Sequence, residues 1–166
     1  MEITFADVSR MTLFRGFDKD FVSLLDLFFV ENNYPADTHL VEQNVLQDRF
    51  YLVIAGSVAV YQSVENRRVP LATLDAGQFF GEINLFDPGL ATASVVALTP
   101  VKTLEISNEQ FRFFIENKPA IAADFTFQLA ETIVRRFRGS NTALIEELNR
   151  PEAIQKAENI SRGMPA

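Results

Sequence analysis

The sequence predicts an α+β fold: an antiparallel β-roll or jelly-roll barrel flanked by N-terminal helices and a long C-terminal helix. Apolar residues recur at helical spacing before residue 33, short strand-like runs fill residues 33–107, and helical periodicity returns over residues 119–148. We therefore expect a single domain over residues 1–148, followed by a polar tail over residues 149–166.

An N-terminal helix is predicted from the segment DKDFVSLLDLFFVEN. Its apolar residues have the spacing of one helix face, and they are Phe21, Leu24, Leu25, Phe28 and Phe29. Asp18 fits the N-cap of this helix, and the Asn32–Asn33 pair fits its stop. A further turn or short helix is expected upstream, around Leu13 and Phe14.

The strands are predicted from short apolar runs separated by turn residues: HLVEQ, RFYLVIAG, SVAVYQSV, VPLATLD, GQFF, ASVVALTP and VKTLEIS. Turn signals about every 8 to 12 residues are typical of an antiparallel sandwich or barrel. Gly56 suits a tight hairpin between two of these runs, and the polar segment ENRR suits a second turn.

The C-terminal part is predicted to be helical from Ser107 onward. Ser107 and Gln110 have the spacing of a capping box, and Pro119 fits the first turn of a long helix. An apolar stripe along that helix comprises Phe125, Leu129, Ile133, Phe137 and Leu144. The stripe fits either packing on the barrel or pairing with a second copy of the chain, so a homodimer through this helix is left open.

Composition argues against several classes of protein. The chain has no Cys, which excludes disulfides, thiolate zinc sites and Cys nucleophiles. Its net charge of −7 argues against a general nucleic-acid or anionic-membrane surface. The single histidine, His39, weakens the main alternative for a small β-barrel, which is a cupin with several His metal ligands. We expect no metal site and no catalytic residues, and hence no enzyme.

The sequence is also expected to be that of a cytoplasmic protein with no membrane partner. Its longest candidate span, FVSLLDLFFV, is far shorter than the roughly 20 residues that a bilayer requires, and it contains Asp26. The N-terminus lacks the basic and then apolar pattern of a secretory signal.

The order of elements, together with the motif GQFFGEINLF, resembles the cyclic nucleotide-binding domain family, in which helices flank a small β-roll. Two glycines of the family fall on Asp37 and Asn44, while its Tyr and hairpin Gly fall on Tyr51 and Gly56. Asp and Asn are the non-glycine residues that best tolerate positive φ, so both turns are expected to survive. The resemblance covers roughly residues 15–148.

The resemblance places a phosphate-binding cassette on this chain. Its ligand-binding residues are expected to be Gly81, Glu82, Ile83, Asn84, Ala91, Thr92, Ala93 and Ser94. The family's glycine lets the backbone approach the ligand, and the turn after it points free N–H groups at an anion. Glu82 matches the acceptor of the ribose 2′-hydroxyl, and Thr92 and Ser94 match hydroxyl residues near the phosphate and base. A cyclic nucleotide is the ligand implied, and no other cofactor is expected.

One position departs from the family's pattern. The Arg that pairs with the phosphate falls on Ala91, and the Pro before it falls on Leu90. An Arg–phosphate pair is bidentate and charge-assisted, and removing one partner costs about 2–5 kcal/mol. A substitute could come from arginines elsewhere in the chain, namely Arg67, Arg68, Arg135, Arg136 and Arg138.

Two functions stay open at this point. The chain is either a non-catalytic regulatory module with a degenerate phosphate site that acts through protein partners, or a true sensor. Such a sensor would bind cyclic AMP, cyclic GMP or another anionic ligand with a non-standard phosphate contact. Related bacterial transcription factors continue into a winged helix-turn-helix after the long helix. Only residues 149–166 remain here, so nucleic acid is not expected as a partner.

Overall fold

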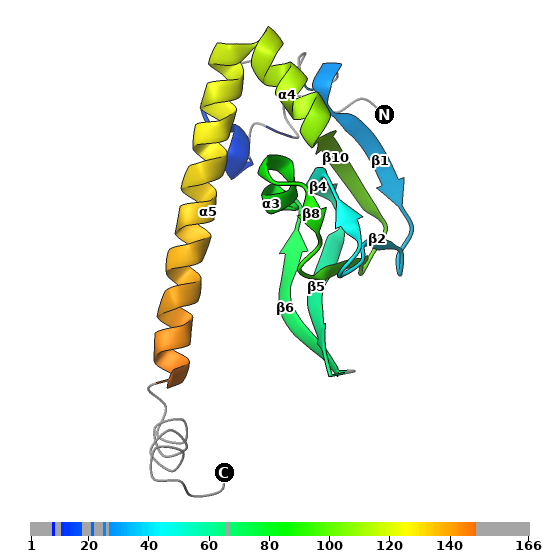
Figure 1. Ribbon diagram of the computed structural model, residues 1–166. Helices are drawn as coiled ribbons and strands as arrows, with labels where there is room; N and C mark the ends of the chain where they lie inside the picture. The colour runs from blue at the N-terminus through cyan, green and yellow to red at the C-terminus, as the bar shows by residue number, and fades with distance from the viewer. Residues whose placement is uncertain are drawn as a thin grey trace, which may run out of the picture. The chain divides into compact units, whose positions relative to one another are not determined.

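The structure is a computed structural model of the chain, and it describes residues 8, 11–17, 21, 25, 27–65 and 67–148 (Figure 1). Contacts divide the chain into two compact units, Met1–Phe125 and Thr126–Ala166. The first unit holds all the strands, and the second consists, in its described part, of the remainder of one long helix.

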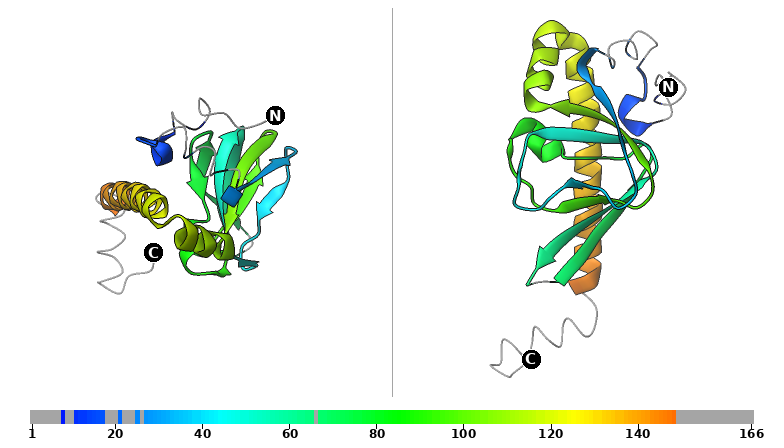
Figure 2. Two further views of the ribbon diagram at one scale, coloured as in Figure 1. Left: turned by 90° about the horizontal axis from the view of Figure 1, so that it is seen from above. Right: turned by 90° about the vertical axis from the view of Figure 1, so that its right-hand side faces the viewer.

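The predicted fold class is confirmed, because antiparallel strands build a roll in the first unit (Figure 2). One sheet has the order β1-β10-β4-β7, a second has the order β2-β9-β5-β6, and β3 pairs with β8. The strands are β1 (Val30–Tyr34), β2 (His39–Val41), β3 (Leu46–Gln47), β4 (Arg49–Ala55), β5 (Ser57–Val64), β6 (Arg67–Asp75), β7 (Phe79–Phe80), β8 (Gly89–Leu90), β9 (Ser94–Ala97) and β10 (Val101–Ser107).

The roll starts earlier than the sequence predicts. The expected stop of the N-terminal helix at Asn32–Asn33 is wrong, because these residues lie in β1 and pair with Lys102 and Thr103 of β10. The pattern misled because β1 itself carries few apolar residues (VENNY), so its identity depends on its partner strand. The predicted short helix upstream is present as η1 (Thr12–Phe14). Asp18 and Leu24 lie outside the described residues.

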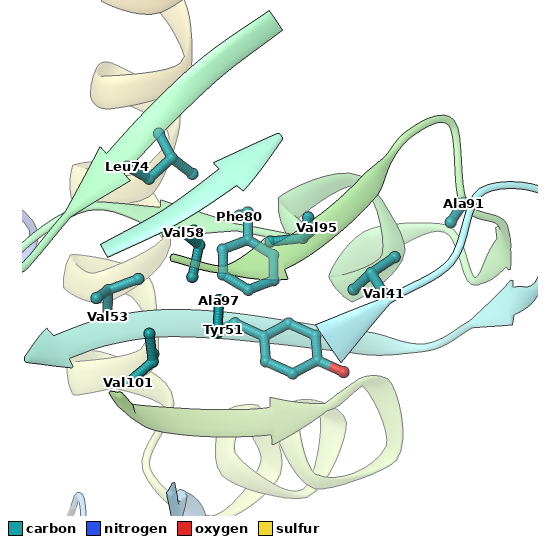
Figure 3. Close-up of a cluster of buried hydrophobic side chains, with 10 residues drawn as sticks. All are labelled: Val41, Tyr51, Val53, Val58, Leu74, Phe80, Ala91, Val95, Ala97 and Val101. Carbon is teal, nitrogen blue, oxygen red and sulfur yellow. The ribbon is translucent and has the colours of Figure 1, made fainter. Parts of the chain in front are cut away.

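Strand β4 separates two hydrophobic cores because its side chains alternate between its two faces. Phe50 and Leu52 face an aromatic cluster centred on Phe125, whose ring lies 5.8 to 6.3 Å from five others: Phe14, Phe29, Phe50, Phe111 and Phe114. Tyr51 and Val53 face the interior of the roll, where side chains from both sheets meet (Figure 3).

Two turns have the backbone that the sequence predicts. Asp37 and Asn44 have φ angles of 66° and 64°, so they occupy the left-handed region in place of glycine. The ENRR segment differs from its prediction, because Arg67 and Arg68 already belong to β6 and pair with Val64 and Ser63.

The helices after the roll also follow the sequence pattern. Helix α4 (Asn108–Asn117) opens with the predicted capping box of Ser107 and Gln110, and the long C-terminal helix α5 spans Pro119–Leu148. Phe125 of the predicted stripe is buried in the first unit, whereas Phe137 is exposed and the side chain of Leu144 lies outside the described residues. Within the part of the chain that the structure describes, no helix is long and apolar enough to cross a membrane.

Candidate functional site

A cavity of about 140 Å³ opens between helix α3 (Glu82–Phe86) and the segment that leads into β9. Seven of the eight predicted site residues line it, and they are Gly81, Glu82, Ile83, Asn84, Ala91, Thr92 and Ala93. The remaining wall is apolar and comprises Val41, Val60, Phe80 and Val95. Val41, Phe80, Ala91 and Val95 belong to the core cluster of the roll, so the cavity adjoins the hydrophobic interior (Figure 3).

Gly81 begins the cavity and has no tolerance for a side chain. Its φ of 78° lies in the left-handed region, and a Cβ at this position would collide with the backbone carbonyl of Arg49. The chain can therefore pass close to β4 and turn directly into α3. The amides of residues 82–84 open that helix, so they lack intrahelical acceptors.

Two polar side chains at the cavity have no protein partner. Asn84 is 9% exposed and its side-chain amide has no hydrogen bond to a described residue, but the polar atoms of this amide remain accessible to solvent, since no fully buried side-chain N or O atom in the described part of the chain lacks a partner. Glu82 is partly buried, and its carboxylate likewise has no hydrogen bond or ion pair within the described part of the chain. The cavity thus offers a negative acceptor and an amide that can both donate and accept.

The position of the family's arginine is occupied by a residue that belongs to the core. Ala91 is 3% exposed and packs in the same cluster as Val41 and Val95. Its N–H donates to the carbonyl of Val45 at 2.9 Å, and its carbonyl accepts from the N–H of Asn44 at 2.8 Å. Both backbone groups of Ala91 are therefore used within the fold and are not free for a ligand.

Ser94, the eighth predicted residue, is not among the residues that line this cavity. Its Oγ accepts a hydrogen bond from the N–H of Gln43 at 3.0 Å, and it lines a separate polar hollow of about 260 Å³ with His39 and Tyr61. In that hollow His39 Nε2 lies 3.0 Å from the Tyr61 hydroxyl. Successive side chains of a strand point to opposite faces of the sheet, and the sequence does not show which of the two faces carries the cavity. The face that Ser94 occupies could therefore not be predicted from its position in the motif.

No Lys or Arg is among the described residues that line the cavity. Arg68 lies over the ring of Tyr61, with its guanidinium carbon 4.8 Å from the ring centroid, and Arg135 pairs with Glu131 on its own helix at 3.2 Å. Among the described residues, no three His, Asp or Glu side chains lie close enough together to hold a metal ion.

A second polar cluster lies in the roll around Glu105, a residue that the sequence analysis did not single out. This buried carboxylate accepts hydrogen bonds from the Tyr34 hydroxyl and the Thr103 hydroxyl, both at 2.7 Å, and pairs with Arg49 at 3.2 Å. Burial, reinforced by the negative charge of Glu105, raises the pKa of Tyr51 to about 12. Burial and the hydrogen bond to Glu105 also raise the pKa of Tyr34. The sequence could reveal this cluster only through the position of Glu105 opposite Tyr51, and that position is known only once the register of β4 and β10 is known.

The antiparallel roll, the glycine-led turn into α3 and the cavity beside it define the class of protein. The family model of the cyclic nucleotide-binding domain matches residues 31–118, and the chain belongs to this family.

Two bacterial transcriptional regulators and one solved structure are similar to it along much of its length. A CRP-like cAMP-activated global transcriptional regulator of Mycobacterium tuberculosis is 26% identical over 140 residues, which are 84% of this chain and 61% of the relative. The cAMP-activated global transcriptional regulator CRP of Pasteurella multocida is 34% identical over 72% of this chain and 58% of its own. The crystal structure of the Thermus thermophilus catabolite activator protein superposes with a TM-score of 0.71 and 29% identity, covering 80% of this chain and 61% of that one.

These relatives correct one expectation from the sequence. The exclusion of nucleic acid as a partner is wrong, because the proteins that this chain matches are transcriptional regulators. The net charge of −7 was a poor guide to nucleic-acid binding, because it is a sum over the whole chain and does not locate charge on a surface. The chain also spans only about 60% of the length of the curated relatives that it matches.

Proposed function

We propose that this chain is a non-catalytic regulatory module of the cyclic nucleotide-binding type with a degenerate phosphate site, and that it acts through contacts with protein partners. Its relatives support the regulatory role, since their names describe cAMP-activated regulators of transcription. The eight residues named from the sequence are proposed as the remnant of the ligand site, with Ser94 the least direct because it lines a different hollow.

The proposal rests on the absence of a cation among the described residues that line the cavity. Ala91 occupies the position of the family's arginine, and it is a core residue whose N–H and carbonyl are both hydrogen-bonded within the fold. Loss of one partner of an Arg–phosphate pair costs about 2–5 kcal/mol, which weakens binding by roughly one and a half to three and a half decades.

The proposal is tested by thermal denaturation of the chain with cyclic AMP and with cyclic GMP. We expect no saturable rise in Tm at ligand concentrations that stabilise a functional relative. Ligand at about 100 times its dissociation constant would stabilise a binding-competent protein by about 2.7 kcal/mol, which is several degrees for a domain of this size. Saturable stabilisation of that size at micromolar ligand would contradict the degenerate site.

Restoring the arginine provides a second test. Ala91→Arg should lower the Tm of the free protein, because a guanidinium replaces a buried methyl group, and should bring a cyclic-nucleotide-dependent rise in Tm that the unmodified chain lacks. Ala76→Arg is the matched control, since Ala76 is exposed in the turn before β7 and is not a cavity residue. Equal responses of the two variants would mean that the cavity is not arranged for a sugar phosphate.

A second candidate function is favoured by one observation, the free amides that open α3 beside Gly81. In this alternative the chain is a sensor of cyclic AMP, cyclic GMP or another anion, and backbone groups replace the arginine. The same titration distinguishes the two, because this alternative requires saturable binding to the unmodified chain.

Protein contacts are supported by exposed apolar side chains near the cavity. Leu46 and Leu90 face each other across the β3–β8 pair and are 71% and 63% exposed, and Phe86 of α3 is 46% exposed. Apolar side chains gathered in this way are typical of interaction surfaces. We expect the double substitution of Leu46 and Leu90 by Lys to weaken binding to a protein partner without lowering Tm, as measured by co-purification of the partner and by thermal denaturation.

A further inference from the structure

A polar hollow of about 260 Å³ lies on the outer face of the sheet that contains β2, β9, β5 and β6. Val95 belongs to the core of the roll, so Ser94, the residue before it in β9, points to the opposite face. Tyr61 follows Val60 of β5 in the same way, and Ser94 and Tyr61 both line the hollow. None of the described residues that line the hollow also lines the cavity beside α3. The hollow is therefore a second concave site.

Hydrogen bonds hold one wall of the hollow in place. The side chain of Gln43, in the turn after β2, accepts from the N–H of Ser63 at 2.6 Å and donates to the carbonyl of Ser63 at 3.4 Å. The N–H of Gln43 donates to Ser94 Oγ at 3.0 Å. The turn is thus tied to both β5 and β9, and it presents Glu42 and Asn44 at the hollow from a backbone that is already ordered.

Arg68 provides a cation at the edge of the hollow. It lies opposite Ser63 across the β5–β6 pair, and its guanidinium carbon is 4.8 Å from the centroid of the Tyr61 ring. The Tyr61 hydroxyl is held in turn by His39, whose Nε2 lies 3.0 Å away. Arg68 forms no ion pair with any described residue, so its N–H groups are free for the carboxylate of a ligand.

Glu42 provides an anion at the same hollow, and it also has no hydrogen-bond or ion-pair partner in the described part of the chain. A ligand with a single charge would be attracted to one of these two groups and repelled by the other. A ligand that carries both a carboxylate and an ammonium group is attracted to both. The charges at the hollow therefore favour a zwitterion.

The size and polarity of the hollow limit this zwitterion further. A cavity of about 150 Å³ encloses a benzene-sized ring, and pockets for drug-sized ligands start at about 300 Å³. The hollow lies between these sizes, so it suits a small molecule. Hydroxyl and amide groups of Ser63, Ser94 and Asn44 are at its lining, so a polar side chain on the ligand finds hydrogen-bond partners there.

We infer that the hollow binds a free polar amino acid. The carboxylate of the ligand pairs with Arg68, its ammonium group pairs with Glu42, and its side chain forms hydrogen bonds with the hydroxyl and amide groups of the lining. This site is on the opposite face of the sheet from the cavity beside α3, so it does not depend on the proposed function.

Isothermal titration of the full chain with L-serine, L-asparagine, L-glutamine and L-leucine tests this site. We expect at least one of the three polar amino acids to bind saturably at millimolar or lower concentration, and L-leucine to bind at least about threefold more weakly. The N-acetyl and carboxamide forms of the amino acid that binds should each bind at least about threefold more weakly, because each loses one of two ion pairs at an exposed site. Affinity should fall as the salt concentration rises, since exposed charges are screened.

Two variants test the charged groups of the protein. Arg68→Gln and Glu42→Gln should each weaken binding by at least about threefold without changing Tm, since both side chains are exposed. Arg67→Gln is the matched control for Arg68, because Arg67 is also exposed but points to the other face of β6. Glu116→Gln, at an exposed position of α4, is the control for Glu42. Both control variants should bind normally.

Saturable binding that requires both charged groups supports this site. The assignment is wrong if none of the three polar amino acids binds, or if the N-acetyl and carboxamide forms bind as tightly as the free amino acid. It is also wrong if the control variants weaken binding as much as Arg68→Gln and Glu42→Gln. None of these results bears on the proposed function, which is decided by titration with cyclic nucleotides at the cavity beside α3.

Discussion

Gly81 shows how a single residue can be required by the backbone alone. Its left-handed φ and its approach to the Arg49 carbonyl both exclude a side chain. We expect Gly81→Ala to lower the free energy of unfolding by about 1–3 kcal/mol, since an alanine must be held in a sparsely populated conformation and β4 must shift.

The matched control for this change is Gly139→Ala. Gly139 lies in α5 with a right-handed backbone and open space where a Cβ would be placed, so alanine should stabilise the helix by about 0.5–1 kcal/mol. Urea denaturation of both variants measures the difference. A neutral effect at Gly81 would show that the turn before α3 adapts to a side chain.

At the same scale, the sequence predicts some residues well and others not at all. Asp37 and Asn44 could be assigned positive φ because a residue's own chemistry sets that tolerance. The hydrogen bonds that hold the backbone of Ala91 could not be predicted, since their partners, Asn44 and Val45, lie far away in the chain. Burial of Asn84 is equally a property of the fold and not of the local pattern.

Among the elements, β10 carries the most consequential polar residue. Glu105 faces Tyr51 across the β4–β10 pair, and its carboxylate accepts a hydrogen bond from the hydroxyl of Tyr34 in β1. Alternation along β10 hides the role of Glu105, because the sequence VKTLEIS shows a charged residue in a strand without showing which neighbours surround it.

This cluster predicts a loss of stability at alkaline pH. The pKa of Tyr51 rises from 10.0 to about 12, so between these values the folded protein holds a proton that the unfolded chain releases. Stability from this group is therefore fully present below pH 10 and falls as pH rises toward 12.

Tyr51→Phe should reduce that loss by up to about 2 kcal/mol, because it removes the titrating group. The stacking of ring 51 on Phe80, with centroids 4.7 Å apart, should be kept. Urea midpoints at about pH 9 and about pH 11.5 measure the effect. Tyr61→Phe, at the separate polar hollow that contains His39, is the control. The explanation fails if the Tyr51 and Tyr61 variants lose stability equally.

Element boundaries were predictable where a local signal exists. The capping box at Ser107 and Pro119 at the start of α5 are such signals, because they act within one helical turn. The prediction that the N-terminal helix extends to Asn32–Asn33 was wrong, because a polar strand such as β1 is recognised only by its pairing with β10.

For the whole molecule, the fold could be predicted and the partners could not. The roll follows from apolar periodicity and turn residues spread over the entire chain, so errors at single positions do not change it. A partner depends on surfaces and on chain length, and the net charge of −7 says nothing of where charge is concentrated. Relatives whose matched part is only about 60% of their length show how much such a judgement can miss.

The fold places different demands on positions 81 and 91. Folding by itself preserves the glycine, because any side chain there collides with a neighbouring strand. Folding makes no demand for an arginine at position 91, where a small residue fills the core. The most recognisable part of the motif is therefore required by the fold itself, and its presence in a sequence identifies an architecture before it identifies a ligand.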